Sequence, residues 1–292
     1  MMQTKADDRR FLNGVRVYYD KNTPRFVKSH QSSVAKAIHR EVWGPQVENE
    51  KEAFEYVNRL ILDVISETAG SDVSPIPVLD LGCGVGGTLF YLAERLRINA
   101  TGVTLSPVGR ILAEQLAQSS GLEKQCRFIE ANYLDLPDFG PFAAAYAVES
   151  FLHGPDPARF FRSAASVMIP GACLMICDDF LTAEGEETKN RTARRYLSDF
   201  KRGWHVGTLI TSRQAQAYAA DAGLALIDDR ELTSYLKLQR PCDRLIAAFV
   251  RLGRGIPFRS PWWDSWVGGH AIQQCLLTGL VQYRFLIFEK VA

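Results

Sequence analysis

The sequence lacks the features that mark secreted, membrane-spanning and disulfide-stabilised proteins. Its first ten residues contain no apolar signal-peptide core, and no apolar run approaches the ~20 residues that a transmembrane helix needs. The six cysteines include no Cys-x-x-Cys pair of the kind that binds zinc. These absences predict a cytoplasmic protein with reduced thiols and no membrane insertion.

An excess of charge of either sign is also missing. The 292 residues carry 34 basic and 33 acidic side chains, a net charge of +1. No overall field therefore favours nucleic acid, an anionic membrane or a polyanionic partner. We expect a small-molecule partner and no binding of nucleic acid, and the sequence leaves a homo-oligomer open.

The chain does contain a regular alternation of apolar runs and amphipathic stretches. Together with two later runs, this alternation predicts an α/β fold: a doubly wound, mostly parallel, seven-stranded sheet covered by helices. The first five strand candidates are Val78–Leu81, Ala100–Leu105, Arg127–Ile129, Phe142–Val148 and Ala172–Cys177.

The segments outside this alternation are predicted to be mainly helical. Residues 1–75 form the expected amino-terminal cap, and residues 76–292 form the core, with insertions at about 183–210 and 235–279 that we expect to build the ligand pocket. The further elements expected after the fifth strand are helices near 185–202, 212–222 and 243–252, strands at 225–227 and 280–289, and a tryptophan-rich loop at 260–266.

The clearest chemical signal is a glycine-rich turn after the first strand. Residues 78–88 read Val-Leu-Asp-Leu-Gly-Cys-Gly-Val-Gly-Gly-Thr, followed by an amphipathic helix. Glycines let the backbone approach a ligand closely, and doubly wound folds hold this turn at the carboxyl end of their first strand. The segment therefore predicts cofactor binding, with Cys83 as a small filler because no nearby base is evident.

Two features of the same region argue against a nicotinamide cofactor. Asp80 precedes the first glycine, where its charge opposes a diphosphate but suits the ammonium group of an amino-acid cofactor. The segment Thr101–Ser106 contains no acid at the place that would bind the nicotinamide ribose. The sequence therefore favours a cofactor with an amino-acid end.

With these motifs the chain resembles class I S-adenosylmethionine-dependent methyltransferases over residues 77–180. The stretch Leu79-Asp80-Leu81-Gly82-Cys83-Gly84-x-Gly86 resembles their motif I. The stretch Gly102–Ser106 resembles the second-strand motif of the branch with cyclopropane fatty acid synthases and geranyl diphosphate and sterol C-methyltransferases. The resemblance implies the Rossmann-like methyltransferase fold and S-adenosyl-L-methionine as cofactor.

The resemblance also implies which residues contact the cofactor. Asn132 stands where the family frequently has an acid that meets the adenine amino group, and its amide oxygen can accept the same hydrogen bond. Aromatic residues of the amino-terminal segment are expected to cap the cofactor. The expected contacts are Asp80, Gly82, Cys83, Gly84, Gly86, Thr104, Leu105, Asn132, Tyr133, Tyr18 and Trp43.

The end of the fourth strand carries the two candidate catalytic residues, Glu149 and His153, in a stretch that resembles sterol and geranyl diphosphate C-methyltransferases. Methylation of an alkene produces a carbocation, which Glu149 could stabilise and then quench by removing a proton. The alternative is that Glu149 orders its loop through backbone hydrogen bonds. His153 is a candidate base for a phenol or amine, or a residue with only a packing role.

Further side chains are expected to bind the acceptor, which the sequence predicts to be small and hydrophobic. Aromatic faces could shield a carbocation, although they are also ordinary core material. Arginines of the 185–202 stretch could bind a diphosphate or form a solvated helix face, and Mg²⁺ is expected only if the acceptor is a diphosphate. The candidates are Tyr19, Tyr196, Phe200, Trp204, Arg191 and Arg195.

The leading hypothesis is C-methylation of an isoprenoid, such as a prenyl diphosphate, or of a related natural product. An O- or N-methyltransferase of a phenolic or amine natural product is the alternative. A protein that binds S-adenosylmethionine without methyl transfer, as a binding module or cyclase, represents another class. A nucleic-acid methyltransferase is disfavoured, because no Asn-Pro-Pro-aromatic motif follows the fourth strand.

Overall fold

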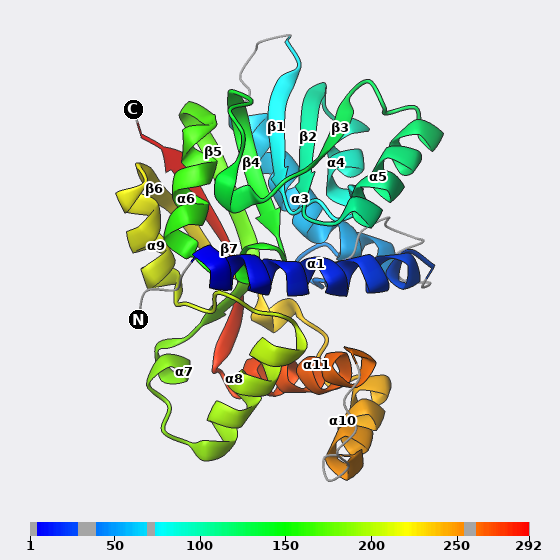
Figure 1. The fold of residues 1–292 in the computed structure, drawn as a ribbon, viewed down its shortest axis with the longest axis vertical. Helices are drawn as coiled ribbons and strands as arrows, with labels where there is room; N and C mark the ends of the chain where they lie inside the picture. The colour runs from blue at the N-terminus through cyan, green and yellow to red at the C-terminus, as the bar shows by residue number, and fades with distance from the viewer. Residues whose placement is uncertain (1–4, 29–38, 69–73, 254–260, 292) are drawn as a thin grey trace.

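The computed structural model describes residues 5–28, 39–68, 74–253 and 261–291. A twisted sheet with helices on both faces forms the upper part of Figure 1, and a separate group of helices lies beneath one edge of the sheet. Helix α1 (Lys5–Lys28) crosses between the two parts. Within the described ranges, no helix is long and apolar enough to cross a membrane.

The sheet contains all seven strands that the apolar runs predicted, in the spatial order β3-β2-β1-β4-β5-β7-β6. The first five are parallel, and β7 runs antiparallel to both of its neighbours. The doubly wound, mostly parallel α/β fold is therefore confirmed. The strands are β1 (Ile76–Leu81), β2 (Ile98–Thr104), β3 (Cys126–Glu130), β4 (Phe142–Val148), β5 (Met168–Leu181), β6 (Leu224–Glu231) and β7 (Val281–Lys290).

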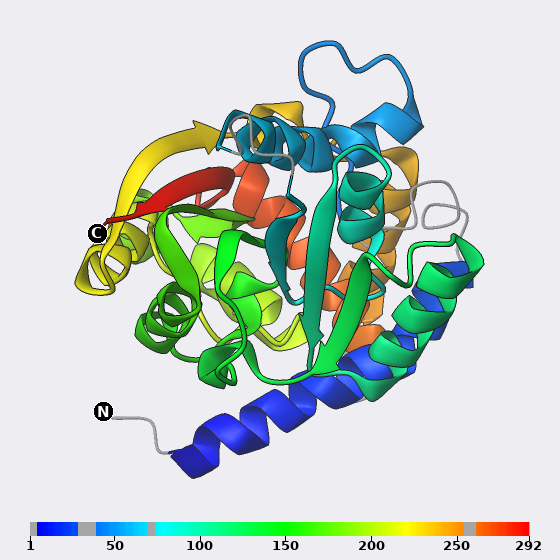
Figure 2. The ribbon, with the colours of Figure 1, turned by 90° about the horizontal axis from the view of Figure 1, so that it is seen from above.

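Helices bury both faces of this sheet. Consecutive side chains of a strand point to opposite faces, so Val78 and Leu79 belong to two different hydrophobic cores. Among the helices that contribute to these cores, three flank the sheet on the side of the first core and two on the side of the second, so the sheet is sandwiched between helical layers (Figures 1 and 2). The first three are α3 (Glu50–Thr68), α4 (Gly87–Ala93) and α5 (Pro107–Ser119), and the other two are α6 (Pro157–Ser166) and α9 (Ser212–Asp221).

The winding of the chain reverses at β1, which pairs with β2 on one side and with β4 on the other. In doubly wound sheets, ligands bind at the carboxyl ends of the strands where this reversal occurs. Asp80 lies near the end of β1, and Glu149 directly follows β4. The topology therefore brings these two acids to the expected binding edge.

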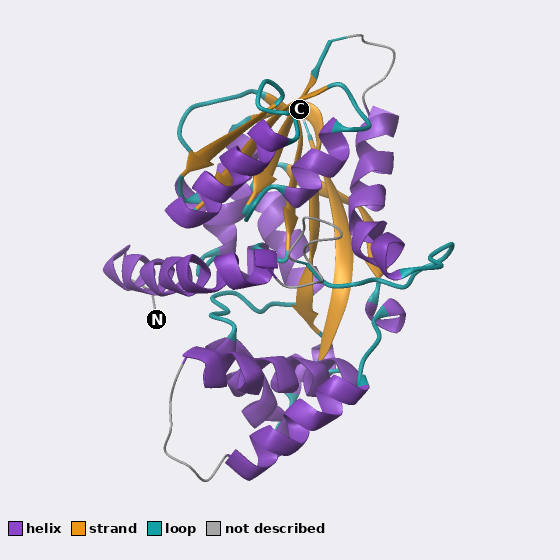
Figure 3. Cartoon of the chain, turned by 90° about the vertical axis from the view of Figure 1, so that its right-hand side faces the viewer, coloured by secondary structure: helices purple, strands orange, loops and turns teal. Residues whose placement is uncertain are grey.

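The lower helices are α7 (Ala183–Glu187), α8 (Arg191–Gly203), α10 (Pro241–Gly253) and α11 (Pro261–Leu277), and they form the separate layer seen in Figure 3. The charged stretch predicted as one helix near 185–202 is two helices. The break occurs before Asn190, whose side-chain oxygen accepts hydrogen bonds from the backbone amides of Thr192 and Ala193 and so caps α8.

The predicted tryptophan-rich loop at 260–266 is wrong, because residues 261–266 form the first turns of α11. Pro261 starts the helix, where its missing N–H costs no hydrogen bond. The helix then packs closely on α8, since a Cβ built on Gly203 would lie only 2.6 Å from Cα of Gly268. Ser260 lies outside the described residues.

Candidate active site at the carboxyl edge of the sheet

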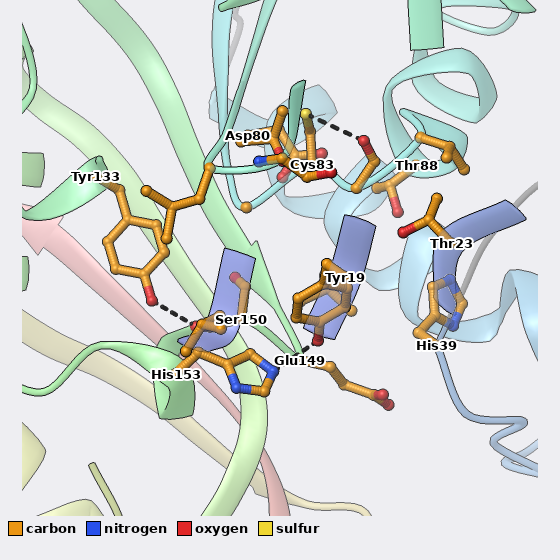
Figure 4. Close-up of a pocket in the computed structure, with 18 of the residues that line it drawn as sticks. Tyr19, Thr23, His39, Asp80, Cys83, Thr88, Tyr133, Glu149, Ser150 and His153 are labelled. Carbon is orange, nitrogen blue, oxygen red and sulfur yellow. Dashed lines mark hydrogen bonds between the residues drawn. The ribbon is translucent and has the colours of Figure 1, made fainter. Parts of the chain in front are cut away.

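Two adjoining cavities lie at the carboxyl edge of the sheet. The first, about 110 Å³, is lined by the glycine-rich turn, the ends of β2 and β4, and α1. The second, about 380 Å³, lies between the sheet edge and the lower helices. Both cavities are lined by Tyr19, His39, Glu149 and His153. Figure 4 shows Tyr19 between Glu149 and His153, with Asp80 and Cys83 at the glycine-turn end of the first cavity.

The glycine-rich turn borders the first cavity with a backbone that only glycine adopts easily. Gly82 and Gly84 have φ values of 105° and 54°. A Cβ on Gly82 would lie 2.4 Å from Cβ of Ser150, so this glycine allows close packing of two strand ends. A Cβ on Gly84 would meet no heavy atom within 4 Å, so the backbone there faces open space that a ligand can occupy.

Asp80 is a buried acid at the edge of the first cavity, with 4% of its surface exposed. Burial raises the pKa of this carboxyl to about 8, an effect that the nearby Tyr146 hydroxyl partly offsets. A cationic ligand beside Asp80 would favour the charged carboxylate. The buried acid and the open space at Gly84 fit the amino-acid end of S-adenosylmethionine.

Helix α1 forms the wall that both cavities share. Its residues Val15, Tyr19 and Thr23, spaced four apart, line the first cavity. The hydroxyl of Ser106 donates a hydrogen bond of 2.6 Å to Asp20, and the same Ser106 oxygen accepts from the amide of Gly109 at the start of α5. Side-chain hydrogen bonding therefore fixes α1 to the core of the sheet domain (Figure 2).

Glu149 lies where the two cavities meet and is held in a defined orientation. One of its carboxylate oxygens accepts hydrogen bonds of 2.9 Å from the backbone N–H of Arg40 and from the Tyr283 hydroxyl. The backbone of Glu149 is left-handed, with φ of 48°, a conformation that costs a non-glycine residue about 1 kcal/mol. The carboxylate therefore orders the segment at Arg40 and also faces both cavities. This geometry is compatible with a catalytic role and with a structural role for Glu149.

His153 is neutral at physiological pH. Its Nδ1 lies 3.1 Å from the carbonyl oxygen of His205, which can only accept, so Nδ1 carries the proton. Its Nε2 then accepts a hydrogen bond from the Tyr19 hydroxyl, with the oxygen 2.7 Å from the nitrogen. Burial lowers the pKa of the imidazole to about 4 and raises the pKa of the Tyr19 phenol well above its usual range.

Seven of the expected cofactor contacts line the first cavity and four do not. Gly86 caps α4, and the amide oxygen of Asn132 accepts from the backbone N–H of Leu134. Tyr18 lines the second cavity instead, and Trp43 lines neither because its ring packs against the Lys237 ammonium group. The seven are Asp80, Gly82, Cys83, Gly84, Thr104, Leu105 and Tyr133.

Two of the six expected acceptor contacts, Tyr19 and Trp204, line the second cavity. Phe200 is fully buried in the core, and Tyr196 packs edge-to-face against the cavity residue His270. The two expected basic residues do not line either cavity: Arg191 and Arg195 lie exposed on α8, and Arg195 pairs with Asp199 of its own helix. The arginine cluster therefore has the solvated helix face that the sequence left as the alternative.

The basic residues that do line the second cavity are Arg40, Lys237 and Arg240, which the sequence analysis did not single out. Arg40 makes two hydrogen bonds of 2.7 and 2.6 Å to Asp179, and Arg240 pairs with Glu41 at 2.9 Å. No local sequence pattern marks these residues, because their acidic partners lie up to 199 positions away. Only the folded structure therefore identifies these three residues as part of the cavity wall.

The adjacent acids Asp178 and Asp179 are already occupied by protein partners. Asp178 accepts from the backbone amides of Leu152 and Asp179, and Asp179 binds Arg40. In the part of the chain that the structure describes, no three His, Cys, Asp or Glu side chains are grouped to hold a metal ion. Both acids therefore have structural partners, Asp178 in backbone amides and Asp179 in the distant Arg40.

Comparisons with known proteins agree with this geometry. Residues 78–171 match the family model described as a methyltransferase domain. The chain is 29% identical over 156 residues to cycloartenol-C-24-methyltransferase 1 of Oryza sativa subsp. japonica, covering 53% of this chain and 45% of that protein. It is 39% identical over 114 residues to the chloroplastic tocopherol O-methyltransferase of Arabidopsis thaliana, covering 38% and 32%. The chain therefore spans less than half the length of these relatives.

The fold is similar to that of geranyl diphosphate C-methyltransferase from Streptomyces coelicolor A3(2), solved with Mg²⁺, geranyl diphosphate and S-adenosyl-L-homocysteine. The TM-score is 0.69 at 16% identity, over 96% of this chain and 98% of that chain. The matched domain and the shared fold confirm the resemblance to methyltransferases that the glycine-rich turn and the second-strand motif indicated. Residues 78–171 match the methyltransferase domain model, and the chain has the Rossmann-like methyltransferase fold.

Proposed function

We propose that the chain is an S-adenosylmethionine-dependent methyltransferase of a small hydrophobic acceptor, and that it methylates carbon in an isoprenoid or related natural product. The observation that carries this proposal is the junction of the two cavities, where Glu149, Tyr19 and His153 line both. A methyl group held in the first cavity and an acceptor in the second would meet at these side chains.

The second cavity favours an acceptor with little charge. Apolar and aromatic side chains make up much of its wall, including Phe54, Trp204 and Trp266. Its three basic residues, Arg40, Lys237 and Arg240, are balanced by Glu41, Glu149 and Asp243, so the wall is formally neutral. We therefore favour a neutral isoprenoid over a prenyl diphosphate, and Mg²⁺ is tied to the diphosphate alternative.

The reaction requires alignment more than a strong catalytic group. Bound S-adenosylmethionine would supply an electrophilic methyl group, and the cavity walls would hold the acceptor in line with it. Transfer to an alkene carbon leaves a carbocation. The Glu149 carboxylate would stabilise that charge and then accept the proton whose loss restores the double bond.

A second candidate function is O- or N-methylation, supported by the state of His153. A neutral imidazole with an Nε2 lone pair can accept a hydrogen bond from a phenol or amine and take its proton as methyl transfer makes that group more acidic, although the lowered pKa makes the imidazole a weak base. This role requires the Tyr19 hydroxyl to give up its 2.7 Å hydrogen bond to Nε2 in favour of the acceptor.

The test is mass-spectrometric detection of labelled methyl transfer to a mixed panel of neutral isoprenoid alkenes, prenyl diphosphates, phenols and amines. We expect a C-methylated isoprenoid that is lost in Glu149→Gln and retained in His153→Gln. A methylated phenol or amine lost only in His153→Gln would establish the second function. Binding of S-adenosylmethionine with no methylated product across the panel would favour a binding module or cyclase.

A further inference from the structure

Helix α10 presents an apolar stripe to solvent. Leu245, Phe249 and Leu252 are 63%, 58% and 81% exposed and lie at i, i+4 and i+7, on one side of the helix. The opposite side holds Ile246 and Val250, which are partly or fully buried. Figures 1 and 3 show α10 at the outer edge of the lower helical layer, beside α11. A large exposed apolar patch of this kind typically marks an interaction surface.

The same exposed side carries positive charge. Arg244 and Arg251 are exposed and, seven positions apart, lie along one margin of the apolar stripe. Asp243 is the one acid in α10, a helix described in full, and its carboxylate accepts from the backbone N–H of Arg240 at the cavity. The surface formed by Arg244, Leu245, Phe249, Arg251 and Leu252, which we call the α10 face, is therefore apolar and basic, although the whole chain has a net charge of only +1.

The α10 face is continuous with the wall of the second cavity. Ile246 of α10 lines that cavity. Phe249, on the exposed side, packs against Trp266 with ring centroids 6.3 Å apart, and Trp266 also lines the cavity. Apolar surface therefore runs from the exposed stripe to the proposed acceptor site.

We propose that the α10 face docks on the surface of an anionic lipid bilayer. Leucine and phenylalanine side chains would enter the boundary between headgroups and acyl chains, while the flanking arginines would bind lipid phosphates. A helix that is apolar along its exposed centre and basic along one margin fits this environment, because an anionic bilayer offers both negative charge and an apolar interior. The docking proposal depends only on the exposed surface of α10. Passage of an acceptor from the bilayer into the second cavity depends in addition on the proposed function.

Flotation with lipid vesicles tests the docking without using activity. The whole chain would be mixed with vesicles of phosphatidylcholine alone or of equal parts phosphatidylcholine and phosphatidylglycerol. We expect flotation with the anionic vesicles, reduced about tenfold in Leu245→Ser/Phe249→Ser/Leu252→Ser and in Arg244→Glu/Arg251→Glu. High salt should weaken it as well.

Matched controls distinguish binding by the α10 face from non-specific adsorption of exposed apolar side chains to the vesicles. Ile111→Ser/Ile227→Ser changes two other exposed apolar side chains, 45% and 54% exposed, and should leave flotation unchanged. Circular dichroism of each variant checks that it is folded. Absence of flotation by the wild type, or equal flotation by the α10 variants, would overturn the proposal. A dimer in lipid-free solution that the triple variant dissociates would identify a second copy as the occupant and also overturn it.

Discussion

The hydroxyl of Tyr19 lies 2.7 Å from Nε2 of His153, although 134 positions separate the two residues in the chain. The contact joins α1 to the turn after β4 and fixes the imidazole as the Nδ1–H tautomer. Because His153 is buried and Tyr19 is half-buried beside the cavities, the fold sets the protonation state of both side chains.

The neutral state of His153 predicts a pH-dependent stability. The imidazole pKa is about 4 in the folded protein and about 6.5 in the unfolded chain, so the unfolded chain binds the proton more readily between these values. The free energy of unfolding is therefore highest above pH 6.5, and it falls as the pH drops towards 4. At pH 5 we expect a loss of about 2 kcal/mol in the free energy of unfolding relative to pH 7.5. Urea denaturation at both pH values measures it.

The variant His153→Gln isolates this effect from other titrating groups. It lacks the imidazole, so its loss of stability between pH 7.5 and 5 should be smaller than that of the wild type by about the same 2 kcal/mol. Equal losses in the two proteins would show that His153 is not held neutral by burial.

Asp80 predicts proton-linked cofactor binding. Its pKa of about 8 means that the carboxyl is protonated at neutral pH in the free protein, and a bound ammonium group would lower that pKa. The affinity for S-adenosylhomocysteine should therefore rise by up to about tenfold per pH unit between pH 6 and 7.5. Calorimetry in buffers of different ionisation enthalpy should detect the released proton.

The substitution Asp80→Asn removes this coupling. We expect weaker S-adenosylhomocysteine binding with little dependence on pH between 6 and 7.5. The folded-state pKa is raised, so the wild-type carboxyl opposes folding increasingly as the pH rises from about 4 to 8. The ligand-free Asn variant should accordingly have a higher Tm at pH 8 than the wild type. Unchanged affinity in Asp80→Asn would rule out contact with the ammonium group.

Gly84 allows a matched test of the cofactor cavity. Gly84→Val would add a side chain to open space beside the turn, whereas the equally open Gly121 lies outside both cavities. Both glycines have positive φ, 54° and 69°, so each substitution costs stability of about 1 kcal/mol from the backbone. We expect Gly84→Val to lose cofactor binding and Gly121→Val to keep it, as measured by calorimetry.

Tyr283 should act as a positioning residue for Glu149. Tyr283→Phe removes the hydroxyl that donates to the Glu149 carboxylate at 2.9 Å, but it keeps the ring in the core. We expect kcat to fall about tenfold, since a misplaced carboxylate stabilises the developing charge less well. The dissociation constant of S-adenosylhomocysteine should not change. Tyr218→Phe, at an exposed tyrosine of α9, is the control and should leave kcat unchanged.

Much of the fold could be predicted because its signals are local. Each strand is a short apolar run, and the turn Gly82–Gly86 follows a strand and precedes a helix within a few residues. The same locality explains why seven of the expected contacts line one cavity, since they come from that turn and from the ends of β1, β2 and β3.

The wall of the second cavity was harder to predict because distant segments of the chain build it. Arg40 meets Asp179 across 139 positions, and Arg240 meets Glu41 across 199. Neither pair has a sequence spacing that indicates contact. Arg191 and Arg195 recur at helical spacing, which correctly indicates a helix. The side of α8 that carries them faces solvent, however, and not the cavity.

The two cavities draw on more of the chain than the matched domain. The methyltransferase domain match covers residues 78–171, whereas Tyr19 comes from α1 and Trp204 and Trp266 come from beyond β5. If the proposed function is correct, substitutions in α1 and the lower helices could change the acceptor without altering the glycine-rich turn. Acceptor preference and methyl-donor binding would then be separable by mutation.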